Sequence, residues 1–137
     1  MTPEAKLSEK VRQGLREWCD IERIENRVNL GIPDMLIGVG NRFVMLELKV
    51  ATGRKVELRP HQIAFHMRHG RLGRPGFILV WKLATKSVPD TLLLYESISA
   101  MQLYGVGIDL PSFKKWELKS MVWREFYEAL ASLDFIC

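Results

Sequence analysis

The stretch from Gly31 to Val50, GIPDMLIGVGNRFVMLELKV, constrains the fold more than any other part of the chain. Two apolar, partly β-branched runs flank Gly40-Asn41, a dipeptide suited to a two-residue turn. The pattern predicts an antiparallel hairpin. With Gly40 and Asn41 as the turn residues, Val39 faces Arg42, and this pair sets the register of the two strands.

That register brings charged side chains together within an apolar hairpin. It places Asp34 opposite Glu47, and because side chains alternate along a strand, Lys49 shares their face. Opposed residues have Cβ atoms roughly 4.5–5.5 Å apart, and like charges so placed repel. We therefore expect the two carboxylates to bind a cation or to raise the pKa of one of them. The alternative is a solvated face of an edge hairpin, with Lys49 as a surface salt-bridge partner.

Carboxylate oxygens are ligands that suit Mg²⁺ or Mn²⁺. Such a metal ion lowers the pKa of a bound water and holds a phosphate oxygen, while a lysine orients or deprotonates the nucleophile. The backbone carbonyl of Leu48, between Glu47 and Lys49, is a further candidate ligand. These residues favour a site for metal-assisted hydrolysis.

The segment after the hairpin predicts an α/β fold. Residues 60–70, PHQIAFHMRHG, are typical of a helix, with Pro60 in its first turn and Gly70 at its end. Residues 77–83, FILVWKL, form a continuous apolar run of the kind found in buried strands. Strand, helix and strand make a βαβ unit, so we expect the strand at 77–83 to run parallel to the second hairpin strand.

The rest of the chain is predicted more coarsely. The expected elements are a helix over 3–18, a polar connection or short strand over 24–28, a strand leading into a short helix over 91–105, and one or two helices over 111–135 with Ser112 as N-cap. We expect one domain, with a core of about residues 4–83 and a mainly helical C-terminal extension of about 84–137. The aromatic residues of that extension are expected to pack in the core or in a dimer.

The formal net charge is +4 at pH 7, a mild basic bias that is compatible with a nucleic-acid partner. Between Val50 and Arg74 the chain has the single acid Glu57 and six basic residues: Arg54, Lys55, Arg59, Arg68, Arg71 and Arg74. We expect these residues to contact phosphates. The histidines at 61, 66 and 69 are expected to be ordinary helix residues, with His61 near the DNA.

The chain lacks a secretory signal pattern and any apolar run approaching the ~18 residues of a membrane span. Cys19 and Cys137 have no zinc-site spacing and are expected to be reduced thiols. We therefore expect a soluble, cytoplasmic protein with no membrane partner, in the host cytoplasm if it is phage-encoded.

Pro33-Asp34 followed by Glu47-Leu48-Lys49 resembles the PD-(D/E)XK nuclease signature. The surrounding sequence, GIPDMLIG, FVMLELKV, LRPHQIAFHMRHG and GFILVWK, resembles more narrowly the VRR-NUC branch. This branch includes small stand-alone phage and bacterial proteins related in fold to archaeal Holliday junction resolvases. The resemblance covers roughly residues 9–82. It implies a restriction-endonuclease-like core, in which helices flank a mixed central sheet.

The resemblance also implies roles for the matching residues. Asp34 and Glu47 match the metal-binding acids of the family. Leu48 matches the residue whose carbonyl completes the metal shell, Lys49 the catalytic lysine, and Gln62 a glutamine beside the active site.

The family further uses a glutamate from its first helix. Glu9 is the choice by spacing, and Glu4 and Glu17 stay open as alternatives.

The function implied is that of a Mg²⁺- or Mn²⁺-dependent endonuclease that hydrolyses phosphodiester bonds in DNA. We expect a structure-selective enzyme, similar to Holliday junction resolvases and acting as a homodimer. One alternative is a sequence-specific restriction or homing-type endonuclease, with residues 84–137 as its specificity surface. The other is a catalytically silent DNA-binding subunit on the same fold.

Overall fold

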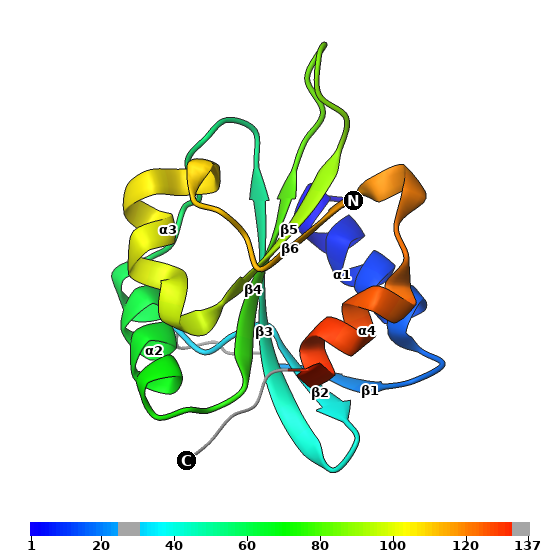
Figure 1. Cartoon of the computed structure of the whole chain (residues 1–137), viewed down its shortest axis with the longest axis vertical. Helices are drawn as coiled ribbons and strands as arrows, with labels where there is room; N and C mark the ends of the chain where they lie inside the picture. The colour runs from blue at the N-terminus through cyan, green and yellow to red at the C-terminus, as the bar shows by residue number, and fades with distance from the viewer. Residues whose placement is uncertain (25–30, 133–137) are drawn as a thin grey trace.

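The computed structural model of the protein describes residues 1–24 and 31–132. One six-stranded mixed sheet is flanked by helices on both faces, which confirms the α/β class (Figure 1). The strands lie in the sheet in chain order: β1 (Asp20–Arg23), β2 (Met35–Val39), β3 (Arg42–Ala51), β4 (Gly76–Lys82), β5 (Thr91–Glu96) and β6 (Lys114–Glu117). Neighbouring strands are antiparallel except β3 and β4, which are parallel.

The predicted hairpin register is confirmed. Val39 pairs with Arg42 across the turn, and the pairing continues to Met35 and Leu46. Gly40 has φ of 61°, a backbone conformation that glycine adopts without strain. The parallel βαβ unit is also confirmed, because α2 (Pro60–Arg71) connects β3 to the parallel strand β4.

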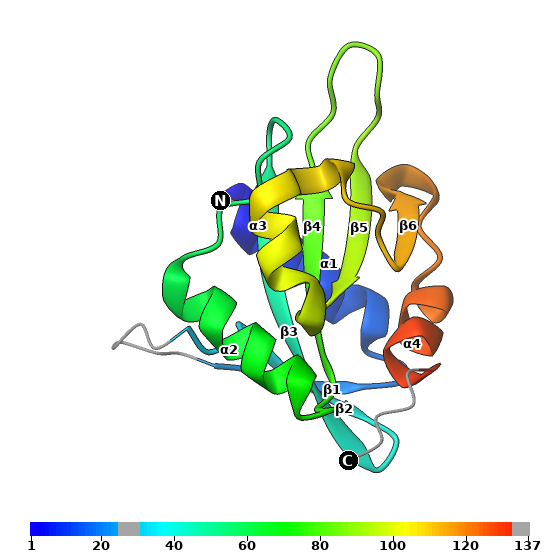
Figure 2. The ribbon, with the colours of Figure 1, turned by 60° about the vertical axis from the view of Figure 1, so that its left-hand side comes forward.

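The helices divide between the two faces of the sheet (Figures 1 and 2). One face is covered by α1 (Pro3–Leu15) and α4 (Trp123–Ser132). The other is covered by α2 and α3 (Ala100–Val106). Three short 3₁₀ helices complete the connections: η1 (Ser97–Ser99), η2 (Gly107–Asp109) and η3 (Leu118–Ser120).

Alternation along the strands produces two separate apolar clusters. On the α1/α4 face, fully buried side chains such as Leu46, Leu79 and Phe126 pack together. On the α2/α3 face, a smaller cluster forms around Ile78 and Val80. Consecutive residues of the central strands therefore serve different cores.

The C-terminal part corrects one prediction. Helix α4 confirms part of the helical expectation for residues 111–135, but Lys114–Glu117 is a strand that pairs with β5. Only Trp116 in this strand is buried, and its neighbours are charged and exposed. The sequence therefore shows no alternation of apolar and polar residues that would predict a strand here. The extension after residue 84 thus adds two strands, β5 and β6, to the same sheet.

Near the N-terminus, a short strand is observed at Asp20–Arg23, and residues 25–28 of the expected connection lie outside the described residues. Cys19 carries a free thiol, whose pKa is raised to about 11 by burial and by the charge of Asp20. Cys137 also lies outside the described residues. Among the helices of residues 1–24 and 31–132, none has the length and apolar character needed to cross a membrane.

Candidate active site

Asp34 and Glu47 meet at the end of the hairpin, where β3 continues past the last residue paired with β2. Asp34 immediately precedes β2 and is half-buried, and its Oδ2 accepts a hydrogen bond from the Leu48 backbone N–H at 2.8 Å. Glu47 lies on the α2/α3 face of β3 and is 2% exposed. The solvated hairpin face considered as an alternative is therefore excluded for Glu47.

Burial of a carboxylate beside a second one changes its titration. Desolvation raises the pKa of Glu47 to about 9, with further contributions from a hydrogen bond with Asp34 and from the Asp34 charge. The charge of Lys49 acts in the opposite direction. A buried carboxyl group with this pKa becomes an anion near neutral pH only if positive charge is brought to it.

Gln62 connects Lys49 to Glu47. Lys49 Nζ donates to Gln62 Oε1 at 2.9 Å, and Gln62 Nε2 donates to Glu47 Oε2 at 3.4 Å. The same Gln62 Oε1 accepts the backbone N–H of Arg59 at 3.0 Å, which caps the first turn of α2. We call Asp34, Glu47, Lys49 and Gln62 the carboxylate–lysine cluster.

The loop before Asp34 is held against the start of α2. Gly31 has φ of 78°, and a Cβ at this position would collide with the backbone of His61. A side chain is thus excluded both by backbone conformation and by space. This close approach brings the Pro33-Asp34 segment to the helix that carries Gln62.

The structure brings Glu4, and not Glu9, to this region. Glu4 lies near enough for its charge to raise the pKa of Glu47. It lines a small hollow of about 20 Å³ whose wall includes Asp34 and Leu48. Glu9 is exposed and lines neither this hollow nor the pocket beside Lys49. Of the first-helix glutamates left open by the sequence, the structure thus brings Glu4 close to Asp34 and Glu47, and it does not bring Glu9 there.

A pocket of about 290 Å³ opens beside the cluster. Its lining includes Glu4, Lys49, Arg59 and the exposed Tyr104 of α3. Because Glu4 borders both this pocket and the smaller hollow at Asp34, the two spaces adjoin. Lys49 is thus accessible from this pocket.

The residues predicted to contact phosphate are all exposed and follow β3 in the chain. They are Arg54, Lys55, Arg59, His61, Arg68, Arg71 and Arg74. Arg54 also forms an exposed ion pair with Asp109 at 3.5 Å, and Arg71 Nε donates to the Met67 carbonyl at 3.2 Å. Both contacts leave further guanidinium N–H groups free to donate, because an arginine carries five.

Sequence reasoning missed His66, which is a buried neighbour of Glu47 and not an ordinary helix residue. Its side chain is fully buried, and Nε2 lies 3.5 Å from Glu47 Oε1. Burial, with the nearby charges of His69 and Lys49, lowers the pKa of His66 to about 4. The helical spacing of four residues from Gln62 was a signal available in the sequence, since residues i and i+4 share one face of a helix.

The residues present fit a small, hard divalent cation. Glu47 Oε1 is buried and has no hydrogen-bond partner in the part of the chain that the structure describes, which leaves it available to a ligand. Among residues 1–24 and 31–132 no group of three or more His, Cys, Asp or Glu side chains is arranged to hold a metal ion. Backbone oxygen, water and substrate must then complete the shell, which is the usual mode of Mg²⁺ binding with one or two carboxylates.

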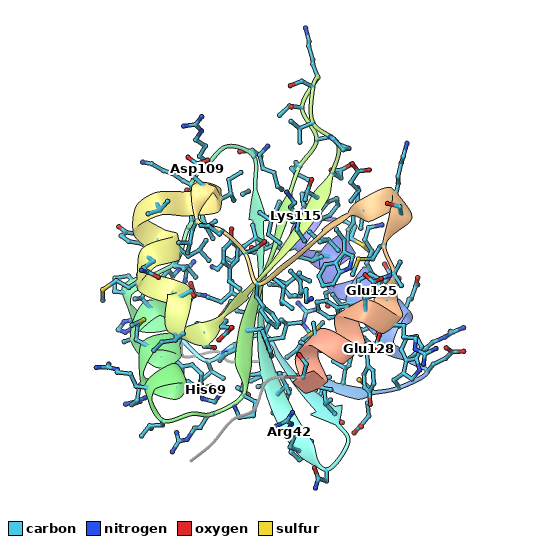
Figure 3. The ribbon with its side chains drawn as sticks, viewed as in Figure 1. Arg42, His69, Asp109, Lys115, Glu125 and Glu128 are labelled. Atoms are coloured by element: carbon cyan, nitrogen blue, oxygen red, sulfur yellow. The ribbon has the colours of Figure 1, made fainter. Side chains whose placement is uncertain are left out.

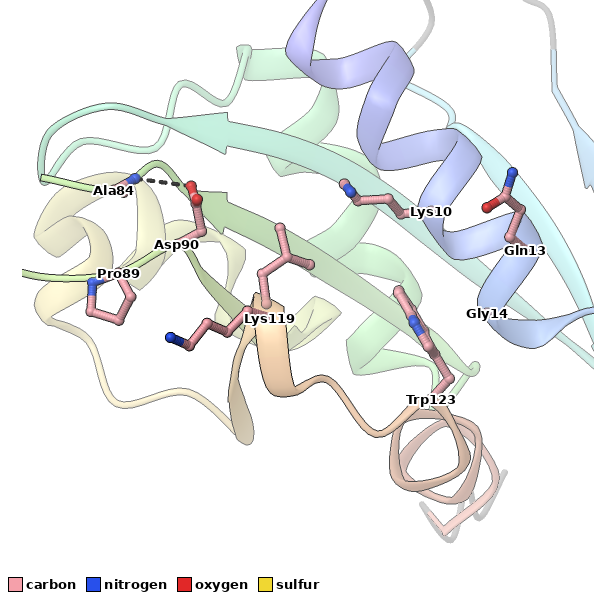
Figure 4. A pocket seen from close by; sticks show the side chains of 9 residues that line it. Lys10, Gln13, Gly14, Ala84, Pro89, Asp90, Lys119 and Trp123 are labelled. Atoms are coloured by element: carbon pink, nitrogen blue, oxygen red, sulfur yellow. Dashed lines mark hydrogen bonds between the residues drawn. The ribbon is translucent and has the colours of Figure 1, made fainter.

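A wider pocket, of about 740 Å³, lies away from the cluster (Figure 4). It is formed between α1, η3, the start of α4 and the β4–β5 loop, and Lys10, Lys119 and Trp123 are part of its wall. Asp90 in this wall accepts hydrogen bonds from Ala84 N and Trp81 Nε1, both at 3.0 Å. Its carboxylate is thus used to hold the loop.

Glu125 and Glu128 on α4 project on the side of the sheet away from His69 on α2 (Figure 3). The predicted phosphate contacts Arg68 and Arg71 belong to α2. Basic residues also occur on the α4 side, for example Lys119 in η3 and Arg124 in α4.

Neither the protein-family models nor the curated proteins provide a match to this chain. The functional assignment therefore depends on the residues and their geometry.

Proposed function

We propose that this protein is a metal-dependent endodeoxyribonuclease with a PD-(D/E)XK core, acting on branched DNA in the manner of a Holliday junction resolvase. The observation that carries the proposal is the carboxylate–lysine cluster. Gln62 of α2 is hydrogen-bonded to both Lys49 and Glu47, and Asp34, just before β2, accepts the backbone N–H of Leu48 between them. A buried glutamate whose pKa is raised to about 9 supports the proposal, because strongly perturbed pKa values cluster at functional sites.

Asp34 and Glu47, with the Leu48 carbonyl, would hold Mg²⁺ or Mn²⁺, which supplies Lewis acidity at the phosphate and lowers the pKa of bound water. Lys49, whose Nζ is held by Gln62 Oε1, orients the attacking water and offsets negative charge that builds on the phosphate. The water oxygen forms a bond to phosphorus as the opposite ester bond breaks. The attacking water gives up one proton to the solvent and the leaving oxygen takes up one, so that the step consumes one water molecule.

The basic residues of α2 and its flanking loops supply the DNA contacts in this proposal. They are exposed and of one sign, and one of them, Arg59, lines the pocket that contains Lys49. Contacts of this kind hold the phosphate backbone without reading its sequence. This supports recognition of DNA shape over recognition of a base sequence.

A homodimer follows from the substrate in this proposal. A four-way junction presents two symmetry-related strands for cutting, and a twofold dimer presents two matched sites. A monomer, with a single site, would cut only one of the two strands in each binding event.

The test is cleavage of an end-labelled four-way junction, a linear duplex and a splayed arm, each with Mg²⁺ or Mn²⁺. Wild type is compared with Asp34→Ala and with Asp20→Ala, which removes an exposed carboxylate from β1. We expect paired nicks near the branch point that Asp34→Ala abolishes and Asp20→Ala retains.

Other outcomes separate the alternatives. Metal-dependent cutting without junction preference would favour a sequence-reading or general nuclease. DNA binding with no cutting would favour a silent subunit. Full cutting by Asp34→Ala would remove the carboxylate–lysine cluster from the mechanism.

A further inference from the structure

His66 and Glu47 form an unusual pair in the interior of the α2/α3 face. Their side chains are 0% and 3% exposed, and His66 Nε2 lies 3.5 Å from Glu47 Oε1. Within residues 1–24 and 31–132, neither of these two atoms has another hydrogen-bond partner. Buried polar atoms are nearly always partnered, and leaving one unpaired is costly. We therefore expect these two atoms to form a hydrogen bond with each other when Glu47 is ionised.

Ser97 of η1 determines how the imidazole ring is presented. Its side chain is buried, and Oγ lies 2.8 Å from His66 Nδ1. When the hydroxyl donates to Nδ1, the ring proton is on Nε2 and points towards Glu47. Gly76 leaves room for this arrangement, since a Cβ there would collide with Ser97 Oγ.

The Glu47 carboxylate is thus approached at both of its oxygens. Gln62 Nε2 donates to Oε2, and His66 Nε2 faces Oε1. Both donors come from α2, one helical turn apart. Rotation of the carboxylate about its terminal bond would disturb both contacts.

We propose that His66 is a positioning residue for a divalent cation at Glu47, with Nε2–H donating to Oε1 of the ionised carboxylate and Ser97 holding the ring. This inference rests on the proposed function. In it, the segment after residue 84 contributes to the candidate site, because Ser97 orients the His66 ring. Partners of this kind, which contact a metal ligand and not the metal, commonly contribute 10- to 100-fold to metal affinity.

The test uses Mn²⁺ alone as the probe, titrated into the full chain by calorimetry without DNA. His66→Leu removes the donor and keeps an apolar side chain of moderate size in the buried position. His66→Gln retains an amide N–H that reaches towards Glu47. Ser97→Ala keeps the imidazole ring but removes the hydroxyl that is hydrogen-bonded to its Nδ1. His69→Leu is the matched control, because His69 lies on the same helix and bonds the Pro75 carbonyl at 2.9 Å.

We expect His66→Leu to weaken Mn²⁺ binding roughly 10- to 100-fold. Ser97→Ala should weaken it less, His66→Gln should restore part of the loss, and His69→Leu should leave it unchanged. Excess Mn²⁺ should then restore cleavage by His66→Leu, which a loss of packing alone would not allow. Circular dichroism checks that each variant is folded. If His66→Leu does not fold, the Mn²⁺ affinities of Ser97→Ala and His66→Gln test the proposal instead.

Unchanged Mn²⁺ affinity in folded His66→Leu, with binding abolished by Asp34→Asn, would overturn the role of His66 and leave the proposed function standing. Wild-type protein that binds no Mn²⁺ at Asp34 and Glu47 would overturn both.

Discussion

The two faces of the central sheet are built from the same strands and serve different ends. In β3, Leu46 and Leu48 point to the α1/α4 face and join its apolar core, whereas Glu47 and Lys49 point to the α2/α3 face. One ten-residue strand therefore contributes to packing with one set of residues and to the candidate site with the alternate set.

The polar groups on the two faces differ in how fully they are paired. On the α1/α4 face, Phe126 packs edge-on against Trp116 and Trp123, with ring centroids 5.7 Å and 5.5 Å apart. The Trp116 indole N–H is satisfied by Glu125 Oε1 at 3.0 Å. On the α2/α3 face, Glu47 Oε1 and His66 Nε2 have no hydrogen-bond partner among the described residues. Buried polar atoms with all their hydrogen bonds made are typical of a region that serves stability. Buried polar atoms without a hydrogen-bond partner are expected at functional sites.

The largest effect is expected from Lys49→Met. Loss of the ammonium should lower kcat for junction cleavage roughly 10²- to 10⁴-fold, because the group acts on the reacting water and phosphate. Lys82→Met is the control: Lys82 Nζ bonds only backbone carbonyls, those of Thr52 and Leu83. Single-turnover cleavage measures both, and equal losses in the two variants would contradict the assignment.

On the other face, Phe126→Ala should act on stability instead. Removing this fully buried ring should lower the free energy of unfolding by about 3–5 kcal/mol. Urea denaturation measures the loss, and the folded fraction should keep wild-type kcat. A fall in kcat per folded molecule would show that the two faces are not independent.

The metal-free protein should lose stability as pH rises. The folded chain keeps a proton on Glu47 up to about pH 9, whereas the unfolded chain releases it near 4.5, so the free energy of unfolding falls across this window. The lowered pKa of His66 acts in the opposite sense, but only between about 4 and 6.5. The fall should therefore be clearest from pH 6.5 to 9.

Urea denaturation with a chelator present, at both ends of this pH range, measures the fall. Glu47→Gln carries no titrating proton and should remove it. The same slope in Glu47→Gln would mean that another group titrates.

Glu4 and Glu9 provide a comparison within one helix. Glu4→Gln should weaken Mn²⁺ binding by roughly tenfold, as loss of a charge close to the ligands commonly does. Glu9→Gln should not change it, since Glu9 is exposed away from both hollows. Calorimetry distinguishes the two, and a larger effect of Glu9→Gln would restore the choice made by spacing.

The smallest effect is expected for single basic residues on the two faces. Arg68→Ala on α2 should reduce the slope of log affinity against log salt by about one unit, as loss of one phosphate contact does. Lys119→Ala, in the wall of the pocket on the α1/α4 side, should leave the slope unchanged. Fluorescence anisotropy over a range of salt concentrations measures both, and equal slopes for the two variants would place DNA on both faces or on neither.

Local patterns predicted the central part of the fold well. The turn at Gly40-Asn41 determines which residues pair, so Asp34 and Glu47 could be brought together from the sequence alone. β4 was found because it is apolar along nearly its whole length. Strand β6 was missed because it has a single buried residue and depends on an edge provided by β5.

Parts of the site depend on contacts that sequence spacing does not encode. Counting residues back from Asp34 suggested Glu9, but the buried positions of α1, Leu7, Ser8, Val11 and Leu15, define a face that Glu4 shares and Glu9 does not. Helical periodicity was the better guide here. The role of His66 depends on Ser97, which is distant in the chain and meets it only when η1 packs on α2.

Gln62 has a consequence for how this site would be observed in solution. Its side-chain oxygen accepts hydrogen bonds from the Lys49 ammonium and from the Arg59 backbone N–H. The first turn of α2 and the position of Lys49 therefore depend on the same atom. Exchange of the Arg59 amide hydrogen with deuterium therefore reports, at single-residue resolution, whether Lys49 is held in place. A backbone NMR signal thus reports the arrangement of the carboxylate–lysine cluster in the absence of any substrate.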